Sequence, residues 1–306
     1  MPKRLLTLLA ESPIHAGAAA AEGALDLPIQ REAVTGLPVI WGQSLKGALR
    51  DAARDQDWVS EVFGARPPGS GGDRTRGEDA ARVEDIGGDL SPGQVAFGDA
   101  ALLAFPAATD REPFAWTTSR QALHRLHRKA TLLEADLGSL LTGLPGAHTT
   151  IGTAGWAGDK QTIGPYLDTV TVEETIAAIG TFIGMLCCPA TDVFDYMRTK
   201  FGTDLLVVRD SDFRDLTRLA TELAARVQLN EHKTVAHGPF YSEHLPVETV
   251  LVSLLSAEQD RHLRTVQEFF DGRAVQLGGD ESIGKGMLWC RVHDTATLAA
   301  ALPKES

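Results

Sequence analysis

The sequence lacks several features that define common protein classes. It has only three cysteines, the adjacent Cys187 and Cys188 and the distant Cys290, and no CxxC pair. An odd number of cysteines without a disulfide-framework spacing favours a reducing compartment. The absence of CxxC spacing also argues against a structural zinc site. We therefore expect all three thiols to pack in the core.

Long apolar runs are also missing, and none of those present is long enough to span a membrane. The start, MPKRLLTLLAESPIHAG, combines basic residues with a short apolar run and so weakly resembles a signal peptide. The run is short, however, and its leucines suit a first core strand equally well. We predict a core strand here and a cytoplasmic protein without membrane partners.

Positive charge is scarce, since the formal net charge is -12. This balance argues against a simple nucleic-acid binder, although a local basic groove can lie on an acidic body. One segment is basic: no acidic residue occurs between Glu112 and Glu134. It contains Arg120, Arg125 and Arg128 on a helix that we expect to begin near Ser119. A solvated helix face and an RNA-binding face fit this pattern equally well.

Familiar catalytic motifs are absent as well, including a Ser-His-Asp arrangement, GxSxG and HExxH. Residues 278–287, GGDESIGKGM, match a phosphate-binding P-loop except at its last position, where Gly286 replaces the Mg²⁺-binding Ser or Thr. A P-loop also follows a strand and opens a helix, whereas we predict helix, loop and strand in that order. A glycine-rich turn remains, in which we expect Gly284 and Gly286 to allow close backbone approach and Lys285 to contact a phosphate backbone.

The 306 residues fit one large domain or two ordinary ones, and the 43% hydrophobic content is typical of a globular protein. Strands separated by helices indicate an α+β sheet layered by helices. Residues 44–63 predict a helix with Ser44 as its N-cap. Residues 64–94 are rich in Gly, Pro, Asp and Arg and predict a flexible loop insertion. A hairpin is predicted at 226–247.

Four stretches together resemble the RAMP superfamily of CRISPR proteins, and within it the family of the fourth Cmr subunit of type III-B effector complexes. They are residues 12–54, which include DLPIQRE and GQSLKGALRDAAR, and residues 95–119, 226–249 and 278–287. They follow in the right order over nearly the whole chain. DLPIQRE is specific to this family, whereas the glycine-rich loop alone is a weak signal.

The resemblance implies a single domain, 1–306, with a ferredoxin-like, RRM-type core, helical insertions and a protruding β-hairpin thumb. It implies head-to-tail stacking of copies along a CRISPR guide RNA, with other effector subunits and a single-stranded target RNA as partners. It also implies cleavage of the target with a divalent metal ion, Mg²⁺ or Mn²⁺. The motif Asp is Asp26, the implied catalytic and metal-binding residue, and His15 is a second catalytic candidate. A structural RNA-binding subunit without nuclease activity, in which Asp26 only orders its loop, is the alternative.

Two further sets of residues are candidates for RNA contact. Ser44 and Lys46 lie at a predicted helix N-terminus, where free N–H groups and the helix dipole favour a phosphate, and Arg50 shares a face with Lys46. A solvated helix start is the plainer interpretation, but together with the family motif we favour guide-RNA contact. In the predicted thumb, Phe240, Tyr241 and His244 are candidates for stacking against unpaired bases.

Overall fold

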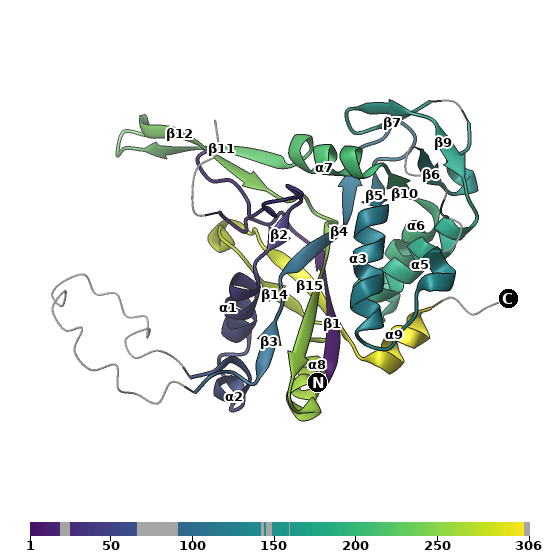
Figure 1. Cartoon of the computed structure of the whole chain (residues 1–306). Helices are drawn as coiled ribbons and strands as arrows, with labels where there is room; N and C mark the ends of the chain where they lie inside the picture. The colour runs from purple at the N-terminus through teal and green to yellow at the C-terminus, as the bar shows by residue number, and fades with distance from the viewer. Residues whose placement is uncertain (19–24, 66–90, 142–143, 145–148, 159, 303–306) are drawn as a thin grey trace.

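The computed structural model describes residues 1–18, 25–65, 91–141, 144, 149–158 and 160–302 (Figure 1). Most of the predicted 64–94 loop therefore lies outside the described residues. Among the described residues, no helix is both long enough and apolar enough to cross a bilayer. The described part of the chain forms a mixed α+β fold around one large sheet.

Within the described residues, 11 strands form this sheet. Nine of them follow the order β14-β15-β1-β13-β4-β5-β10-β6-β9, while β2 pairs with β4 and β3 with β13. The β5–β10 and β6–β9 pairs are parallel and the other pairs are antiparallel. The strands are β1 (Lys3–Ala10), β2 (Val39–Ile40), β3 (Val95–Phe97), β4 (Ala100–Ala107), β5 (Ala115–Ser119), β6 (Thr150–Gly152), β9 (Val170–Val172), β10 (Leu205–Val208), β13 (Val250–Ala257), β14 (Ala274–Gln276) and β15 (Met287–His293).

Strand β1 lies inside the sheet, which confirms the predicted core strand at the N-terminus. Successive side chains of a strand point to opposite faces, so the leucine run supplies both faces of the sheet. Leu6 and Leu8 pack in one hydrophobic core, whereas Leu5 and Leu9 pack in the other. The chain therefore needs apolar cover on both faces of the sheet.

Helices provide this cover on each side (Figure 1). Four helices of the described part of the chain bury side chains in the core that contains Leu6 and Leu8: α1 (Gly42–Ala52), α2 (Val59–Phe63), α7 (Asp210–Leu219) and α8 (Asp260–Phe270). Five helices among the described residues bury side chains in the core that contains Leu5 and Leu9: α3 (Arg120–Thr131), α4 (Gly138–Leu141), α5 (Thr175–Cys187), α6 (Asp195–Thr203) and α9 (Thr295–Ala301). Three short 3-10 turns are η1 (Ala154–Trp156), η2 (Asp192–Phe194) and η3 (Glu281–Ile283), and two small hairpins are β7 (Gln161–Ile163) with β8 (Tyr166–Asp168) and β11 (Glu222–Leu229) with β12 (Val235–His244).

The predicted helix 44–63 is in fact two helices, and its predicted N-cap is wrong. Helix α1 begins at Gly42, so Ser44 lies inside the first turn. The Gly42 N–H donates to Asp99 Oδ1 at 2.7 Å, a partner from the distant β3–β4 turn. A Cβ at position 42 would lie 2.3 Å from the Phe97 carbonyl oxygen, so glycine is required for this close approach. A tertiary contact thus takes the place of a local side-chain cap.

The predicted helix start at Ser119 is confirmed, because the Ser119 side chain accepts from the Ala122 N–H at 3.3 Å. Leu123 and Leu126 belong to the buried face of α3. The three cysteines are free thiols buried in the core. Burial raises the pKa of the Cys187 and Cys290 thiols, so both stay protonated at neutral pH.

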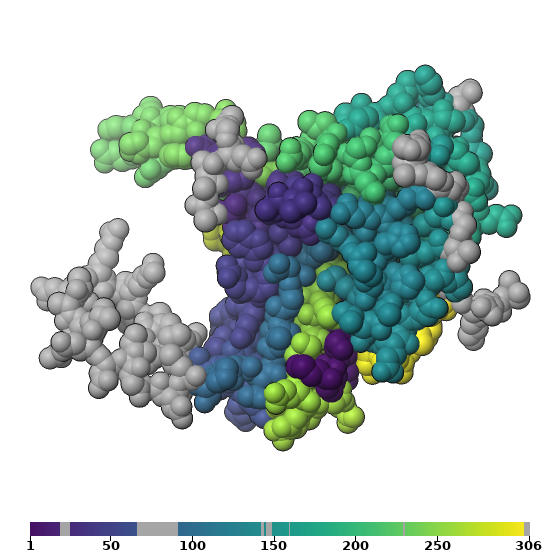
Figure 2. Space-filling model, viewed as in Figure 1, coloured from purple at the N-terminus to yellow at the C-terminus, as the bar shows by residue number. Residues whose placement is uncertain are grey.

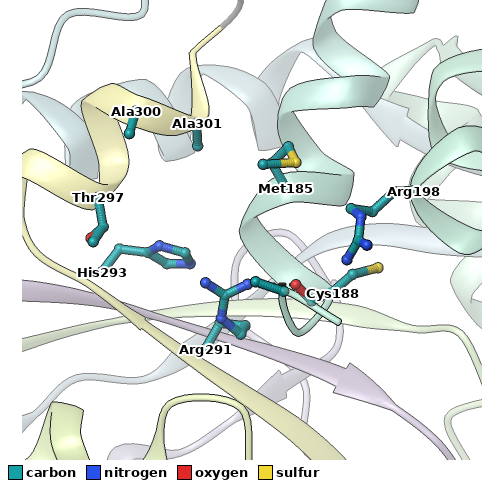
Figure 3. Close-up of a pocket in the computed structure, with 9 residues that line it drawn as sticks. Met185, Cys188, Arg198, Arg291, His293, Thr297, Ala300 and Ala301 are labelled. Carbon is teal, nitrogen blue, oxygen red and sulfur yellow. Dashed lines mark hydrogen bonds between the residues drawn. The ribbon is translucent and has the colours of Figure 1, made fainter. Parts of the chain in front are cut away.

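A pocket of about 360 Å³ lies between α5, α9 and β15 (Figure 3). Its polar side chains close the C-terminal end of α5, where carbonyl groups have no partner within the helix. Arg291 donates to the carbonyl oxygen of Cys188 at 2.5 Å, and Arg198 to that of Pro189 at 2.6 Å. His293 Nε2 donates to the carbonyl oxygen of residue 186 at 2.8 Å, and burial lowers its pKa to about 4, so the ring is neutral. Arg291 and Arg198 thus bond to carbonyl groups of the chain itself, whereas His293 Nδ1 is buried without a hydrogen-bond partner among the described residues.

Glu248 provides a pH test of the fold. Burial, reinforced by the nearby charge of Glu11, raises the pKa of the Glu248 carboxyl from 4.5 to about 7. Because the folded state binds this proton more tightly than the unfolded state, the raised pKa costs stability as the pH rises from 4.5 to about 7. We expect Glu248→Gln to raise the free energy of unfolding by about 2 kcal/mol at high pH, after allowing for partial exposure. Urea unfolding at mildly acidic and mildly alkaline pH measures this, and an equal gain at both would contradict it.

Candidate functional site

The β11–β12 hairpin projects from the body of the protein (Figure 1) and forms a separate lobe in the space-filling view (Figure 2). It spans 222–244, close to the predicted 226–247. Phe240 and Tyr241 are 44% and 42% exposed, so both rings are available for stacking. His244, however, is 1% exposed, and its predicted stacking role is wrong, because this residue lies where the hairpin enters the core.

Asp26 lies against the base of the hairpin. Its Oδ2 accepts the Tyr241 N–H at 2.8 Å. The next residue, Leu27, donates its N–H to the Tyr241 carbonyl at 3.1 Å and accepts from the Glu243 N–H at 3.0 Å. The segment at Asp26 and Leu27 thus pairs alongside β12, and the Asp26 residue is exposed. This is a carboxylate fixed by backbone contacts but open to a ligand.

His15 is held on the same edge of β12. Its Nδ1 lies 2.7 Å from the Glu243 carbonyl oxygen, and since a carbonyl only accepts, Nδ1 carries the proton. The side chain is buried, with 9% of its surface exposed, and in the neutral ring the lone pair is then on Nε2. The Tyr241 N–H that binds Asp26 and the Glu243 carbonyl that binds His15 are two residues apart, roughly 7 Å along the strand. The structure thus brings the two predicted catalytic residues to one short stretch of β12.

The glycine-rich loop packs against His15. The Gly279 N–H donates to the His15 carbonyl at 2.9 Å, and the Gly286 N–H donates to the Pro13 carbonyl at 2.8 Å. Gly284 and Gly286 have φ of +77° and +85°, a backbone region that favours glycine. A Cβ at Gly286 would lie 2.2 Å from the Leu277 carbonyl oxygen. These contacts account for the glycines near the predicted site.

The predicted order of helix, loop and strand around this loop is wrong, because the three-residue strand β14 lies between α8 and the loop. The loop therefore connects two antiparallel strands, β14 and β15. Strand β15 begins directly after this loop, at Met287, so the N-terminal N–H groups of a P-loop helix do not follow Lys285. Lys285 is partly buried, with Nζ 3.8 Å from Glu222 Oε2 on the hairpin.

An ion-pair cluster links the loop and hairpin that sequence reasoning treated separately. Asp280 binds the guanidinium of Arg226 through both carboxylate oxygens, and its Oδ2 is 3.1 Å from His244 Nε2. The contacts with Arg226 and His244 hold the pKa of Asp280 at about 2, whereas burial lowers the pKa of His244. The His244 and His15 rings are 5.3 Å apart. An Asp inside the glycine-rich loop was visible in the sequence, but its partners were not.

The DLPIQRE stretch also positions the site through residues not predicted as functional. Gln30 is buried: its Nε2 donates to the Gly17 carbonyl at 3.1 Å and to Ser44 Oγ at 3.2 Å, and its Oε1 accepts the Trp41 N–H at 2.7 Å. It therefore ties the His15 segment to the start of α1. Ser44, predicted to bind RNA, accepts this internal hydrogen bond.

The neighbouring Arg31 anchors the hairpin. Its guanidinium donates to Glu243 Oε1 at 2.5 Å, and Glu243 Oε2 accepts the Ile29 N–H at 3.1 Å. Glu243 is 2% exposed, so this is a buried ion pair. Arg31 and Glu243 are 212 positions apart in the sequence, so no local sequence pattern predicts their contact.

The predicted RNA-binding cations occupy separate surfaces. Lys46 lines a cleft of about 510 Å³ beside α2 and β3, and Arg50 donates to the Gly64 carbonyl at 2.9 Å. Arg120 donates to the Leu144 carbonyl at 3.0 Å. Arg50 and Arg120 thus both make internal contacts as well as carrying charge.

Arg125 and Arg128 line a pocket of about 320 Å³ together with Lys129. Arg125 pairs with Glu32 at 2.7 Å, and burial, with the charge of Arg125, lowers the pKa of Lys129. This pocket lies on α3, which packs against the opposite face of the sheet from α1. The structure therefore groups Arg125 and Arg128 but does not bring them together with Lys46 and Lys285 in one described cavity.

Among the residues that the structure describes, no group of three or more His, Cys, Asp or Glu side chains is placed to hold a metal ion. Asp26 is therefore a single carboxylate donor. Mg²⁺ keeps several waters and often binds through one or two carboxylates together with substrate phosphates. Asp26 fits a metal held in that way and does not fit a closed all-protein site.

Comparisons with known proteins identify the family to which the chain belongs. Residues 7–289 match the model of the RAMP superfamily. The CRISPR system Cmr endoribonuclease Cmr4 from Pyrococcus furiosus is 30% identical over 94% of this chain and 95% of its own. A crystal structure of oligomeric Cmr4 from Pyrococcus furiosus has a TM-score of 0.70 at 25% identity, covering 96% of this chain and 99% of that one.

A cryo-EM structure of the type III-B Cmr-beta bound to cognate target RNA contains a chain of similar fold, with a TM-score of 0.67 at 19% identity. The match covers 97% of this chain and 98% of that one. The family model covers the central sheet, the hairpin and the glycine-rich loop. The protein therefore belongs to the RAMP superfamily.

Proposed function

We propose that this protein is a guide-RNA-binding backbone subunit of a cytoplasmic CRISPR ribonucleoprotein, which stacks in several head-to-tail copies with other effector subunits. In the assembled complex it cleaves single-stranded target RNA at regular intervals in antiviral defence. The resemblance to the Cmr endoribonuclease Cmr4 over 94% of the chain supports this role. The observation that carries it is the placement of exposed Asp26 at the base of a projecting hairpin, beside His15.

The strand order also supports the RRM-type core and the thumb in this proposal. Strands β15, β1, β13 and β4 are neighbours and antiparallel. Helix α1 lies between β1 and β4 in the sequence, and helix α8 between β13 and β15. A four-stranded antiparallel sheet with two such helical connections is the ferredoxin-like pattern. The β11–β12 hairpin is then the thumb, with Phe240 and Tyr241 placed to stack on bases.

Asp26 and His15 have distinct roles in the proposed reaction. Asp26 would hold a divalent ion, Mg²⁺ or Mn²⁺, through a carboxylate oxygen, together with RNA phosphate and water. When bound, such an ion stabilises charge that develops on the phosphate. His15, with Nδ1–H fixed on Glu243, offers Nε2 to accept or return a proton.

A guide RNA would contact Lys285 and the backbone of Gly284 and Gly286, the cleft beside Lys46, and the α3 pocket. The α3 pocket carries three cations against the two carboxylates of Glu32 and Asp99, so its lining is net positive in an acidic protein. Arg128 is exposed there. Local basic sites of this kind reconcile the net charge of -12 with RNA binding.

The purely structural alternative is supported by one observation. Asp26 Oδ2 accepts the Tyr241 N–H, so the carboxylate also orders its own loop. An Asn at position 26 can accept the same hydrogen bond while lacking the charge. Asp26→Asn therefore separates the two functions, and cleavage of labelled target by the assembled complex is the test.

Lys285 tests the phosphate contact of the glycine-rich loop. We expect Lys285→Ala to weaken guide-RNA binding about three- to tenfold. The slope of the logarithm of the binding constant against the logarithm of the salt concentration should become less steep by about 1, because one phosphate contact is lost. Fluorescence anisotropy at several salt concentrations measures both, with exposed Lys160→Ala as the control. Mg²⁺-nucleotide binding should be undetectable before and after the change. Saturable nucleotide binding by the unmodified protein would contradict the assignment and favour a nucleotide site.

A further inference from the structure

The Asp280 carboxylate contacts both strands of the hairpin from outside it. Arg226 of β11 donates from Nη1 to Oδ1 at 2.5 Å and from Nη2 to Oδ2. His244, the last residue of β12, donates from Nε2 to Oδ2 at 3.1 Å, because an ionised carboxylate only accepts. The Asp280 side chain is 16% exposed. One carboxylate therefore holds the hairpin base through each of its strands.

Asp280 is itself rigidly placed. It has φ of +69°, a left-handed conformation that Asp tolerates better than most residues. Its carbonyl accepts the Lys285 N–H at 3.2 Å, which closes the loop. The adjacent Gly279 N–H donates to the His15 carbonyl at 2.9 Å. Backbone hydrogen bonds thus connect the Asp280 segment both to Lys285 and to the segment of His15.

A short path leads from Asp280 to the proposed catalytic carboxylate. His244 and Tyr241 lie three residues apart on β12, and the Tyr241 N–H donates to Asp26 Oδ2 at 2.8 Å. A shift of β12 at its base therefore moves the group that holds Asp26. Asp280 links the glycine-rich loop to β12 through His244 and to β11 through Arg226.

We propose that Asp280 is a positioning residue: it fixes the base of the hairpin to the glycine-rich loop and so maintains the relative positions of Asp26 and His15 that cleavage requires. The catalytic part of this inference rests on the proposed nuclease function. An ordinary stabilising ion pair would connect two elements only. Asp280 instead connects the loop that carries Lys285 with both strands of the hairpin, so RNA contact at the loop and cleavage at Asp26 share one rigid support.

Asp280→Asn is the direct test, because Asn also tolerates a left-handed backbone and keeps the shape while removing the charge. In the assembled complex we expect single-turnover cleavage of target RNA to fall about 10- to 100-fold, as for misplaced catalytic groups. Guide-RNA affinity should stay unchanged or increase, since a negative charge near phosphate is lost. Exposed Glu281→Gln removes the same charge one residue away and should leave cleavage unchanged.

Hydrogen exchange of the full chain gives a readout that does not depend on nuclease activity. Asp280→Asn should speed exchange of the amides at 241–245 by about tenfold or more, because local opening becomes easier. Arg226→Gln should do the same. The double variant should exchange no faster than Asp280→Asn alone, since the Arg226–Asp280 contact that Arg226→Gln removes is already affected by Asp280→Asn.

Three results would overturn the inference. One is unchanged exchange at 241–245 in Asp280→Asn, and another is unchanged cleavage by a variant complex whose wild type cleaves. The third is an equal loss of cleavage and guide binding with a lowered melting temperature, which would show a general folding role. A wild-type complex that never cleaves would refute the proposed function, and the exchange result would then decide the coupling by itself.

Discussion

Asp26→Asn, introduced into every copy of an assembled complex, is expected to reduce target-RNA cleavage by at least about 100-fold. The physical reason is that the substitution removes the charged oxygen that we propose would face a metal ion, while Asn can still accept the Tyr241 N–H. The loop should therefore stay in place, and guide and target binding should stay within about twofold of wild type. Single-turnover cleavage of end-labelled target, with the product positions resolved, measures the effect.

The matched control for this change is Asp55→Asn, which removes the charge of a carboxylate that is 89% exposed, on the turn between α1 and α2. It should cleave like the wild type. Binding of Mn²⁺ to the complex with target RNA, followed by its paramagnetic effect, adds a readout besides activity. Undiminished cleavage by Asp26→Asn at every position would refute the catalytic role and leave the structural alternative.

Glu243→Ala should cost about 3–5 kcal/mol of folding stability, the range typical of breaking one side of a buried ion pair. The change leaves the Arg31 guanidinium, 13% exposed, without its carboxylate partner. It also removes the acceptors of the Ile29 N–H and the Thr221 hydroxyl. Urea unfolding of the isolated chain, followed by circular dichroism, gives the free energy.

Glu222→Ala on the same hairpin is the control, because that carboxylate is 44% exposed and lies 3.8 Å from Lys285. It should change the free energy of unfolding by less than about 1 kcal/mol. Pairing Glu243→Ala with Arg31→Leu should recover part of the loss, since no uncompensated charge remains. A cost below about 1 kcal/mol for Glu243→Ala alone would show that the pair does not anchor the hairpin.

Local patterns predicted those parts of the fold whose causes are local. The short run of leucines predicted β1, and the start of α3 was predicted near Ser119. The hairpin was recognisable from its flanking strands, although its ends differ by a few residues. In each case the signal and the structure it specifies lie within the same short segment.

Features that depend on tertiary contacts were not predictable in the same way. Helix α1 begins at Gly42 instead of Ser44 because Asp99, 57 positions away, binds the first N–H. His244 has an aromatic ring and lies in a hairpin, which favoured a stacking role, yet it is buried and hydrogen-bonded to Asp280. Asp26 and His15 were predicted through a family resemblance, whereas the contacts of Asp280, Arg226 and Glu243 are visible only in the packing of distant segments.

The central claim, that copies of this chain stack along a guide RNA, is tested most directly by mass. The purified chain is mixed with guide RNAs of increasing length, and the masses of the complexes are measured by native mass spectrometry or mass photometry. The account predicts that the number of bound copies rises in whole steps with RNA length, with filaments visible by microscopy. A chain that stays monomeric on every RNA length would contradict it.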